Sequence, residues 1–189
     1  MKRLLLVISA TATISLLNIA NAATSGTVDF SGKLTDQTCQ VTLNDGSSAS
    51  GTVVMHTVSK SELLPLNATA GRTPFTLKLT GCKASTTAFG VTAYFPNNPA
   101  NISDRKLINK ETGATAATGV GLELIFTQNG IEQVIPLGWD SSQYNFQTIA
   151  ANTTSATMNY AVRYVKTSDA GSVKAGKVTG IAIYELYYK

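Results

Sequence analysis

The 189-residue sequence is poor in the side chains on which most enzymes and metal sites depend. It has one histidine, His56, and two cysteines, and charged residues make up only 14% of it. It contains no nucleophile-elbow, phosphate-loop, dinucleotide-binding or zinc-protease motif. Its acidic residues are mostly isolated, so a glycosidase would need a carboxylate pair assembled by the fold. We therefore expect no catalytic residue, no metal and no cofactor, and interpret His56 as a structural residue.

Long apolar runs are scarce too, and the one at the start predicts export. Lys2 and Arg3 precede the apolar stretch Leu4–Leu17, and Ala20–Ala22 is a small-residue cleavage site. The stretch is too short to span a bilayer, because a membrane-spanning helix needs roughly 20 apolar residues. We predict a signal peptide at 1–22, whose removal leaves one domain and lowers the formal charge from +4 to +2. The remaining basic residues are scattered, which does not favour a nucleic-acid partner.

Export gives the two cysteines a meaning. Cys39 and Cys82 are the only pair in the chain, and an oxidising compartment favours a disulfide between them. Closing a loop of this length stabilises the fold by about 4 kcal/mol in the chain-entropy model. We predict a structural bridge.

Short β-prone runs separated by turn residues follow the signal, and long helical periodicity is absent. Asn129-Gly130 is the clearest hairpin signal, Asn44–Gly46 predicts a turn, and Ser61–Leu66 predicts one helical turn. This spacing predicts an all-β sandwich. The predicted strands are Val28–Thr35, Thr38–Leu43, Thr52–Thr57, Phe75–Gly81, Phe89–Phe95, Gly121–Thr127, Ile131–Leu137, Thr157–Lys166 and Lys177–Tyr188.

Both ends of the exported chain alternate apolar and polar residues, as half-buried strands do. Near the start, Val28, Phe30, Gly32 and Leu34 share one face. In the last run, one face carries Val178, Gly180, Ala182, Tyr184, Leu186 and Tyr188. An apolar strand edge without a partner aggregates unless another polypeptide covers it. The pattern favours a protein that joins to its neighbours.

The single tryptophan, Trp139, follows a predicted strand and stands between Gly138 and Asp140. Its ring could stack on a sugar or lie in a subunit contact. We favour the simpler interpretation, in which it caps one end of the core.

The two ends and the cysteines together carry a resemblance to a family. Gly-Thr-Val-Asp-Phe-Ser-Gly-Lys-Leu at 26–34 precedes Cys39, and Cys82 ends the run Leu-Thr-Gly-Cys. The chain closes as Tyr-Glu-Leu-Tyr-Tyr-Lys, and Gly176 is fourteenth from its end. In these features the chain resembles the fimbrial subunits (pilins) of the bacterial chaperone–usher pathway, near the type 1 major-subunit branch.

The resemblance implies an incomplete immunoglobulin-like sandwich that lacks its final strand and is completed by donor-strand complementation. Residues 23–35 would be an N-terminal extension running into the first strand, and 36–189 the pilin domain. Val28, Phe30, Gly32 and Leu34 would be the donor residues that enter a neighbouring subunit. The acceptor and chaperone edge would comprise Gly176, Ala182, Tyr184, Leu186 and Tyr188.

The implied function is that of a structural subunit of a surface fimbria, which polymerises by donor-strand exchange and supports cell adhesion. Its implied partners are other pilin subunits, a periplasmic chaperone and an outer-membrane usher. Two alternatives stay open: a minor or adaptor pilin of the same pathway, and a free-standing carbohydrate-binding adhesive domain.

Overall fold

The fold is that of a computed structural model, which describes residues 27–29, 31–32, 34–140, 144–167 and 172–189. The chain divides into two units, Met1–Leu34 and Thr35–Lys189. The predicted signal peptide and Phe30 lie outside the described residues. Strands make up the second unit, together with one short 3-10 helix, η1 (Lys60–Leu63), which confirms the all-β prediction.

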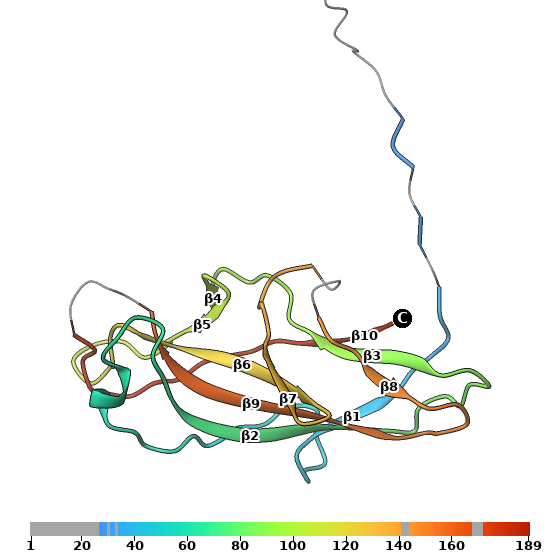
Figure 1. The fold of residues 1–189 in the computed structure, drawn as a ribbon, viewed down its shortest axis with the longest axis horizontal. Helices are drawn as coiled ribbons and strands as arrows, with labels where there is room; N and C mark the ends of the chain where they lie inside the picture. Colours follow the sequence, from blue (N-terminus) through green and yellow to red (C-terminus); the bar gives the residue numbers. More distant parts are fainter. Residues whose placement is uncertain (1–26, 30, 33, 141–143, 168–171) are drawn as a thin grey trace, which may run out of the picture. The chain divides into compact units, whose positions relative to one another are not determined.

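The larger sheet has the strand order β1-β2-β9-β6-β5-β4, and β7 also pairs with β6. Every pair in it is antiparallel, and its longest strands lie at the centre (Figure 1). Its strands are β1 (Gln40–Leu43), β2 (Thr69–Thr80), β4 (Ile102–Ser103), β5 (Lys106–Ile108), β6 (Val120–Gln128), β7 (Ile131–Val134) and β9 (Ala156–Lys166).

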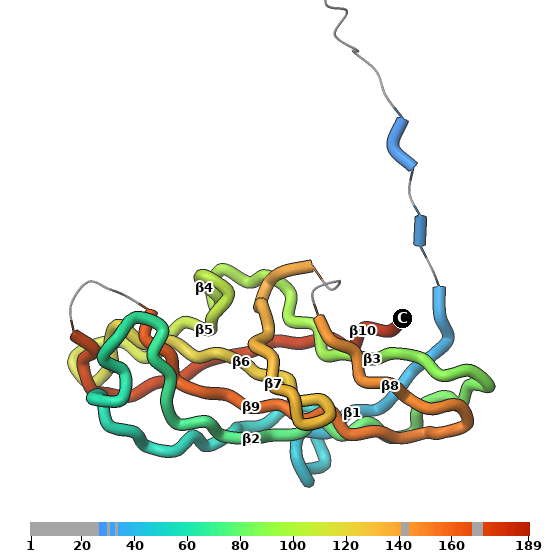
Figure 2. Tube along the Cα trace, viewed as in Figure 1, coloured from blue at the N-terminus to red at the C-terminus, as the bar shows by residue number. Residues whose placement is uncertain are grey.

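The smaller sheet has the order β10-β3-β8, formed by β10 (Glu185–Tyr188), β3 (Phe89–Tyr94) and β8 (Gln147–Ile149). β10 is therefore an edge strand. Figure 2 traces the red C-terminal run across the domain to the place where it lies beside β3. Side chains of both sheets share one core, which makes the domain a sandwich. Its members include Leu77, Val91, Leu124, Ile149 and Tyr160.

Local turn chemistry matches the sequence predictions. Asn129 and Gly130 have φ values of 52° and 77° and join β6 to β7, so the predicted hairpin is confirmed. The predicted helical turn is η1, which opens with a capping box in which Ser59 N donates to Glu62 Oε1 at 3.1 Å. Asn44 has a φ of 52° at the predicted turn after β1.

Several predicted strands are shorter than expected or absent in the ladders of the described chain, and the described residues of Val28–Thr35 form none. The run Thr52–Thr57 has no ladder, and the predicted strand Lys177–Tyr188 forms a ladder only over β10, with an isolated bridge between Lys177 and Ala116 at its start. The physical reason is the same for both: the pattern of apolar side chains is present, but no described strand lies alongside to pair with. β7 stops at Val134 because Pro136 has no amide hydrogen to donate.

Other differences concern short or irregular strands. β4, β5 and β8, of two or three residues each, were not predicted. β2 begins six residues earlier than predicted, at Thr69, because a β-bulge between Ala70 and Thr73 lets it continue past Gly71, whose φ is 66°.

Candidate functional site

Two runs of the domain have apolar side chains on the core and no strand partner. Among the described residues, no backbone–backbone hydrogen bond involves 51–58 or 180–184. We call these two runs the open edge. Backbone groups this near an apolar core ordinarily pair with another strand or with water.

The last run follows the predicted alternation except at Ala182, and the first run also places apolar side chains on the core. In the first run Val53, Met55 and Val58 are half-buried, whereas Val54 is exposed. Towards the C-terminus Val178, Tyr184, Leu186 and Tyr188 are half-buried and pack against the core cluster, as Val53 and Met55 also do. Core-facing apolar side chains on both runs therefore remain partly accessible to solvent.

Ala182 departs from its neighbours, because it is exposed although it has the same parity as Tyr184. The described chain leaves the backbone on both sides of Ala182 unpaired. The open edge is thus accessible to a partner at this residue as well.

Two tyrosines connect the C-terminal run to the region of β1. Tyr184 Oη donates to Ala49 O at 2.9 Å, and Cys39 N donates to Tyr188 Oη at 3.0 Å. Their rings lie 6.2 Å from Phe95 and 6.3 Å from Phe89, respectively. Burial raises the pKa of Tyr184, so this hydroxyl stays a donor at neutral pH.

Gly176 is needed because the backbone of the C-terminal run passes very close to residues 115–117. A Cβ on Gly176 would lie 2.5 Å from Ala116 C, Ala117 N and Thr115 O. Lys177 N donates to Thr115 O at 2.8 Å, and Ala117 N donates to Lys177 O at 3.0 Å. These bonds hold the beginning of the run in place.

The predicted donor residues belong to the first unit. Val28 and Leu34 are 74% and 101% exposed, and a Cβ on Gly32 would have no atom within 4 Å.

The predicted disulfide is confirmed. Cys39 and Cys82 are bonded and join the chain just before β1 to the chain just after β2. Backbone hydrogen bonds continue beside the bridge, where Lys83 N donates to Thr38 O at 2.9 Å.

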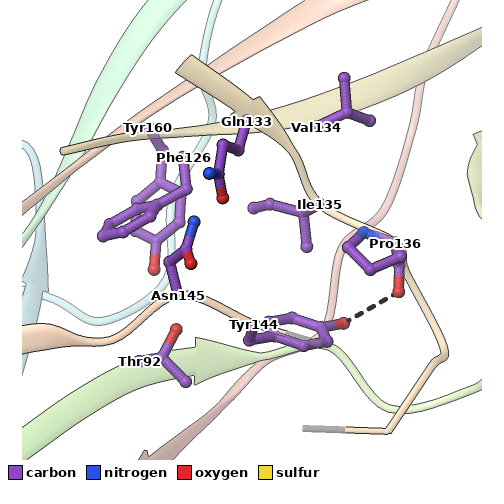
Figure 3. A pocket seen from close by; sticks show the side chains of 9 residues that line it. All are labelled: Thr92, Phe126, Gln133, Val134, Ile135, Pro136, Tyr144, Asn145 and Tyr160. Carbon is purple, nitrogen blue, oxygen red and sulfur yellow. Dashed lines mark hydrogen bonds between the residues drawn. The ribbon is translucent and has the colours of Figure 1, made fainter. Parts of the chain in front are cut away.

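A small pocket lies between β3 and the segment that follows β7 (Figure 3). Tyr144 Oη reaches Pro136 O at 3.4 Å across it, and burial raises the pKa values of Tyr144 and Tyr160 to about 12. Its titratable side chains are therefore neutral at physiological pH. The pocket is lined by Thr92, Phe126, Gln133, Val134, Ile135, Pro136, Tyr144, Asn145 and Tyr160.

Trp139 does not cap the core, so that interpretation is wrong. It is 47% exposed, and Arg105 Cζ lies 4.8 Å from the centre of its ring. Gly138 N donates to Phe95 O at 3.0 Å, which fixes the loop and directs the next side chain outward. His56 is exposed, with Nδ1 3.4 Å from Thr73 Oγ1.

The described residues include no group of three metal-ligating side chains and no helix long and apolar enough to cross a membrane.

Comparison with known proteins places the chain among fimbrial sequences. The family model described as "Fimbrial protein" matches residues 28–189. The major fimbrial subunit SMF-1 of Stenotrophomonas maltophilia is 36% identical over 170 residues, covering 89% of this chain and 95% of the relative. The F17 fimbrial protein of Escherichia coli is 35% identical over 173 residues, covering 90% and 91%.

Solved structures share the fold. The P pilus rod subunit PapA is 15% identical with a TM-score of 0.51, and the match covers 80% of this chain and 99% of PapA. A chaperone–usher pilus subunit is 18% identical with a TM-score of 0.51, over 89% of this chain and 98% of that one. The sandwich is thus of the immunoglobulin-like type found in these pilus subunits.

Proposed function

The chain belongs to the fimbrial protein family and is a structural subunit of a fimbria, and we propose that its copies join by donor-strand exchange. In this mechanism, residues 23–35 of one copy add as a strand to the open edge of the next. Val28, Phe30, Gly32 and Leu34 would be the donor residues. Gly176, Ala182, Tyr184, Leu186 and Tyr188 would lie on the acceptor edge.

The observation that carries the proposal is the open edge itself. Its backbone is unpaired within the described chain over 51–58 and 180–184, while half-buried core side chains flank both runs. Strand addition supplies main-chain hydrogen bonds to such an edge and side chains to the core beneath it, and chaperone–pilin pairs are an established example of this mode of recognition.

The energetics favour a stable link. Each main-chain hydrogen bond contributes about 1 kcal/mol net, and each buried valine, leucine or phenylalanine side chain roughly 1.5–3 kcal/mol. The exposed side chains of Val28 and Leu34 gain this burial only in the complex. Because the contact is head-to-tail and does not close, it propagates into a filament.

A periplasmic chaperone would occupy the same edge first and would deliver the subunit to an outer-membrane usher. We propose that 1–22 is a signal peptide, that the exported chain passes through the periplasm to the surface fimbria, and that its role in adhesion is structural rather than catalytic. The names of the relatives favour the major subunit.

The test uses two variants that add the same charge at adjacent positions of the extension. Phe30→Asp places a carboxylate on the predicted donor face, whereas Ser31→Asp places one on the opposite face. We expect Phe30→Asp to leave the subunit folded and exported but to abolish surface fimbriae and their detergent-resistant multimers. Ser31→Asp should assemble normally. Fibres formed equally by both variants would sink the donor-strand assignment.

A further inference from the structure

The C-terminal run is apolar on its outward face as well as on its core face. Ile181, Ile183 and Tyr187 are 46%, 52% and 46% exposed. Glu185, also exposed, stands between them in the sequence. We call these four residues the outer stripe. None of them is among the acceptor residues proposed above, because alternate residues of an extended run point to opposite faces and these four lie on the outward face.

Glu185 is unusual among the acidic residues of the domain. Of the described carboxylates in 35–189, it alone has neither a hydrogen bond nor an ion pair. An unpaired carboxylate beside exposed apolar side chains fits a partner that offers a cation next to an apolar surface.

The same domain carries such a surface. Arg105 stacks on the exposed ring of Trp139, 4.8 Å from the guanidinium carbon to the ring centre. Arg105 Nη2 lies 4.0 Å from Asp104 Oδ1, and Asp104 Oδ2 accepts from Lys106 Nζ at 3.1 Å. A guanidinium carries five N–H donors, so Arg105 has the capacity to bind a further carboxylate.

The hairpin between β4 and β5 presents this cation. Asp104 and Arg105 have φ values of 45° and 62° because they form its two-residue turn, which requires a left-handed backbone at both positions. Arginine and tryptophan are also the residues most enriched where protein contacts are strongest. We call Arg105 and Trp139 the Arg–Trp corner.

We propose that the outer stripe of one copy docks on the Arg–Trp corner of another copy in the same fimbria, with Glu185 pairing with Arg105. A second copy is the occupant that the chain's own chemistry fits, since it offers the complementary cation and the exposed ring. It is also the macromolecule that a structural subunit has beside it at fixed spacing throughout the fibre. The contact is heterologous, so the helical operation repeats it along the filament.

This contact is too small to hold free subunits together. Six side chains are far fewer than the roughly 20–30 residues a side of a stable interface. Within a polymer the neighbours are already tethered, and the effective concentration makes weak repeated contacts add up. The contact would therefore set the width and stiffness of the fibre rather than its continuity.

The test is a charge exchange in fimbriae assembled from the full-length chain. Glu185→Arg and Arg105→Glu are made singly and together, with Lys60→Glu as a charge-reversal control away from both surfaces. Fibre width and persistence length are measured by electron microscopy, and the multimers in unheated detergent report strand exchange separately. Each single variant should give thinner, more flexible fibres with an unchanged multimer pattern, because each contact weakens roughly fivefold. The double variant should restore the wild-type fibre.

Wild-type width and stiffness in both single variants, or no recovery in the double variant, would overturn the proposal. A variant that loses its multimers has failed in strand exchange, and the uncharged substitution Tyr187→Ser, which lies in β10 outside the open edge, then decides. Thin, flexible fibres with normal multimers from Tyr187→Ser support the lateral contact. Fewer but otherwise normal fibres would assign the stripe to the export machinery and refute it.

Discussion

Replacing Gly176 by alanine should destabilise the domain because the added methyl group has nowhere to go. The new Cβ would lie 2.5 Å from three backbone atoms of residues 115–117, about 1 Å closer than ordinary contact. Backbone cannot rotate away as a side chain does. Overpacking of this kind costs typically about 1–3 kcal/mol.

Instead of accepting the overlap, the C-terminal run around residue 176 could move away from residues 115–117, but this movement would cost about as much. Lys177 N–Thr115 O, Ala117 N–Lys177 O and Asn109 Nδ2–Lys177 O would be lost or weakened. At about 0.5–1.5 kcal/mol each, the loss of these hydrogen bonds would cost about as much as the overpacking. We expect Gly176→Ala to lower the free energy of unfolding by about 2–3 kcal/mol, or the melting temperature by roughly 5–10 °C.

Gly180→Ala is the matched control four residues away. Its Cβ would lie 2.7 Å from Leu122 Cδ1, a side-chain atom that can move. We expect a loss below about 1 kcal/mol in urea unfolding of the exported chain. Equal midpoints for the two variants would refute the argument that backbone proximity fixes the glycine at 176.

Other predictions follow from single contacts. Removing the disulfide with Cys39→Ser and Cys82→Ser should cost about 4 kcal/mol of stability. The double variant should have a lower melting temperature that added reductant does not lower further, and an unchanged melting temperature would contradict the prediction. Tyr188→Phe should cost about 1 kcal/mol by removing the acceptor of the Cys39 amide. Burial raises the pKa of Tyr160 from 10 to about 12, so its contribution of about 2–3 kcal/mol is complete below pH 10 and is lost as the pH rises towards 12; alkaline unfolding of Tyr160→Phe should lack this part.

The features that could be predicted from the sequence are those set by local chemistry or by elimination. Asn129-Gly130 gave the hairpin because both residues tolerate positive φ, and two cysteines in an exported chain allow one bridge. Alternation in the last run identified Val178, Tyr184, Leu186 and Tyr188 as core-facing, although Ala182 on the same face is exposed.

Alternation could not reveal whether a partner strand is present, since it reports a face and not a ladder. The runs 51–58 and 180–184 therefore read as ordinary strands. β4, β5 and β8 are too short to establish a period. The stacking of Arg105 on Trp139 joins residues far apart in sequence through a turn of two non-glycine residues with positive φ, which no local pattern indicates.

The most direct test of the central claim is thermal unfolding of the exported chain, alone and with a second copy of Ala23–Leu34 joined after Lys189 by a flexible linker. A linked copy carrying Phe30→Asp is the control. The account predicts that the added segment raises the melting temperature by more than about 10 °C, from several newly buried side chains and main-chain bonds, and abolishes self-association, while the control does neither. A stable monomer whose melting temperature the segment leaves unchanged would show that the sandwich is already complete and contradict the account.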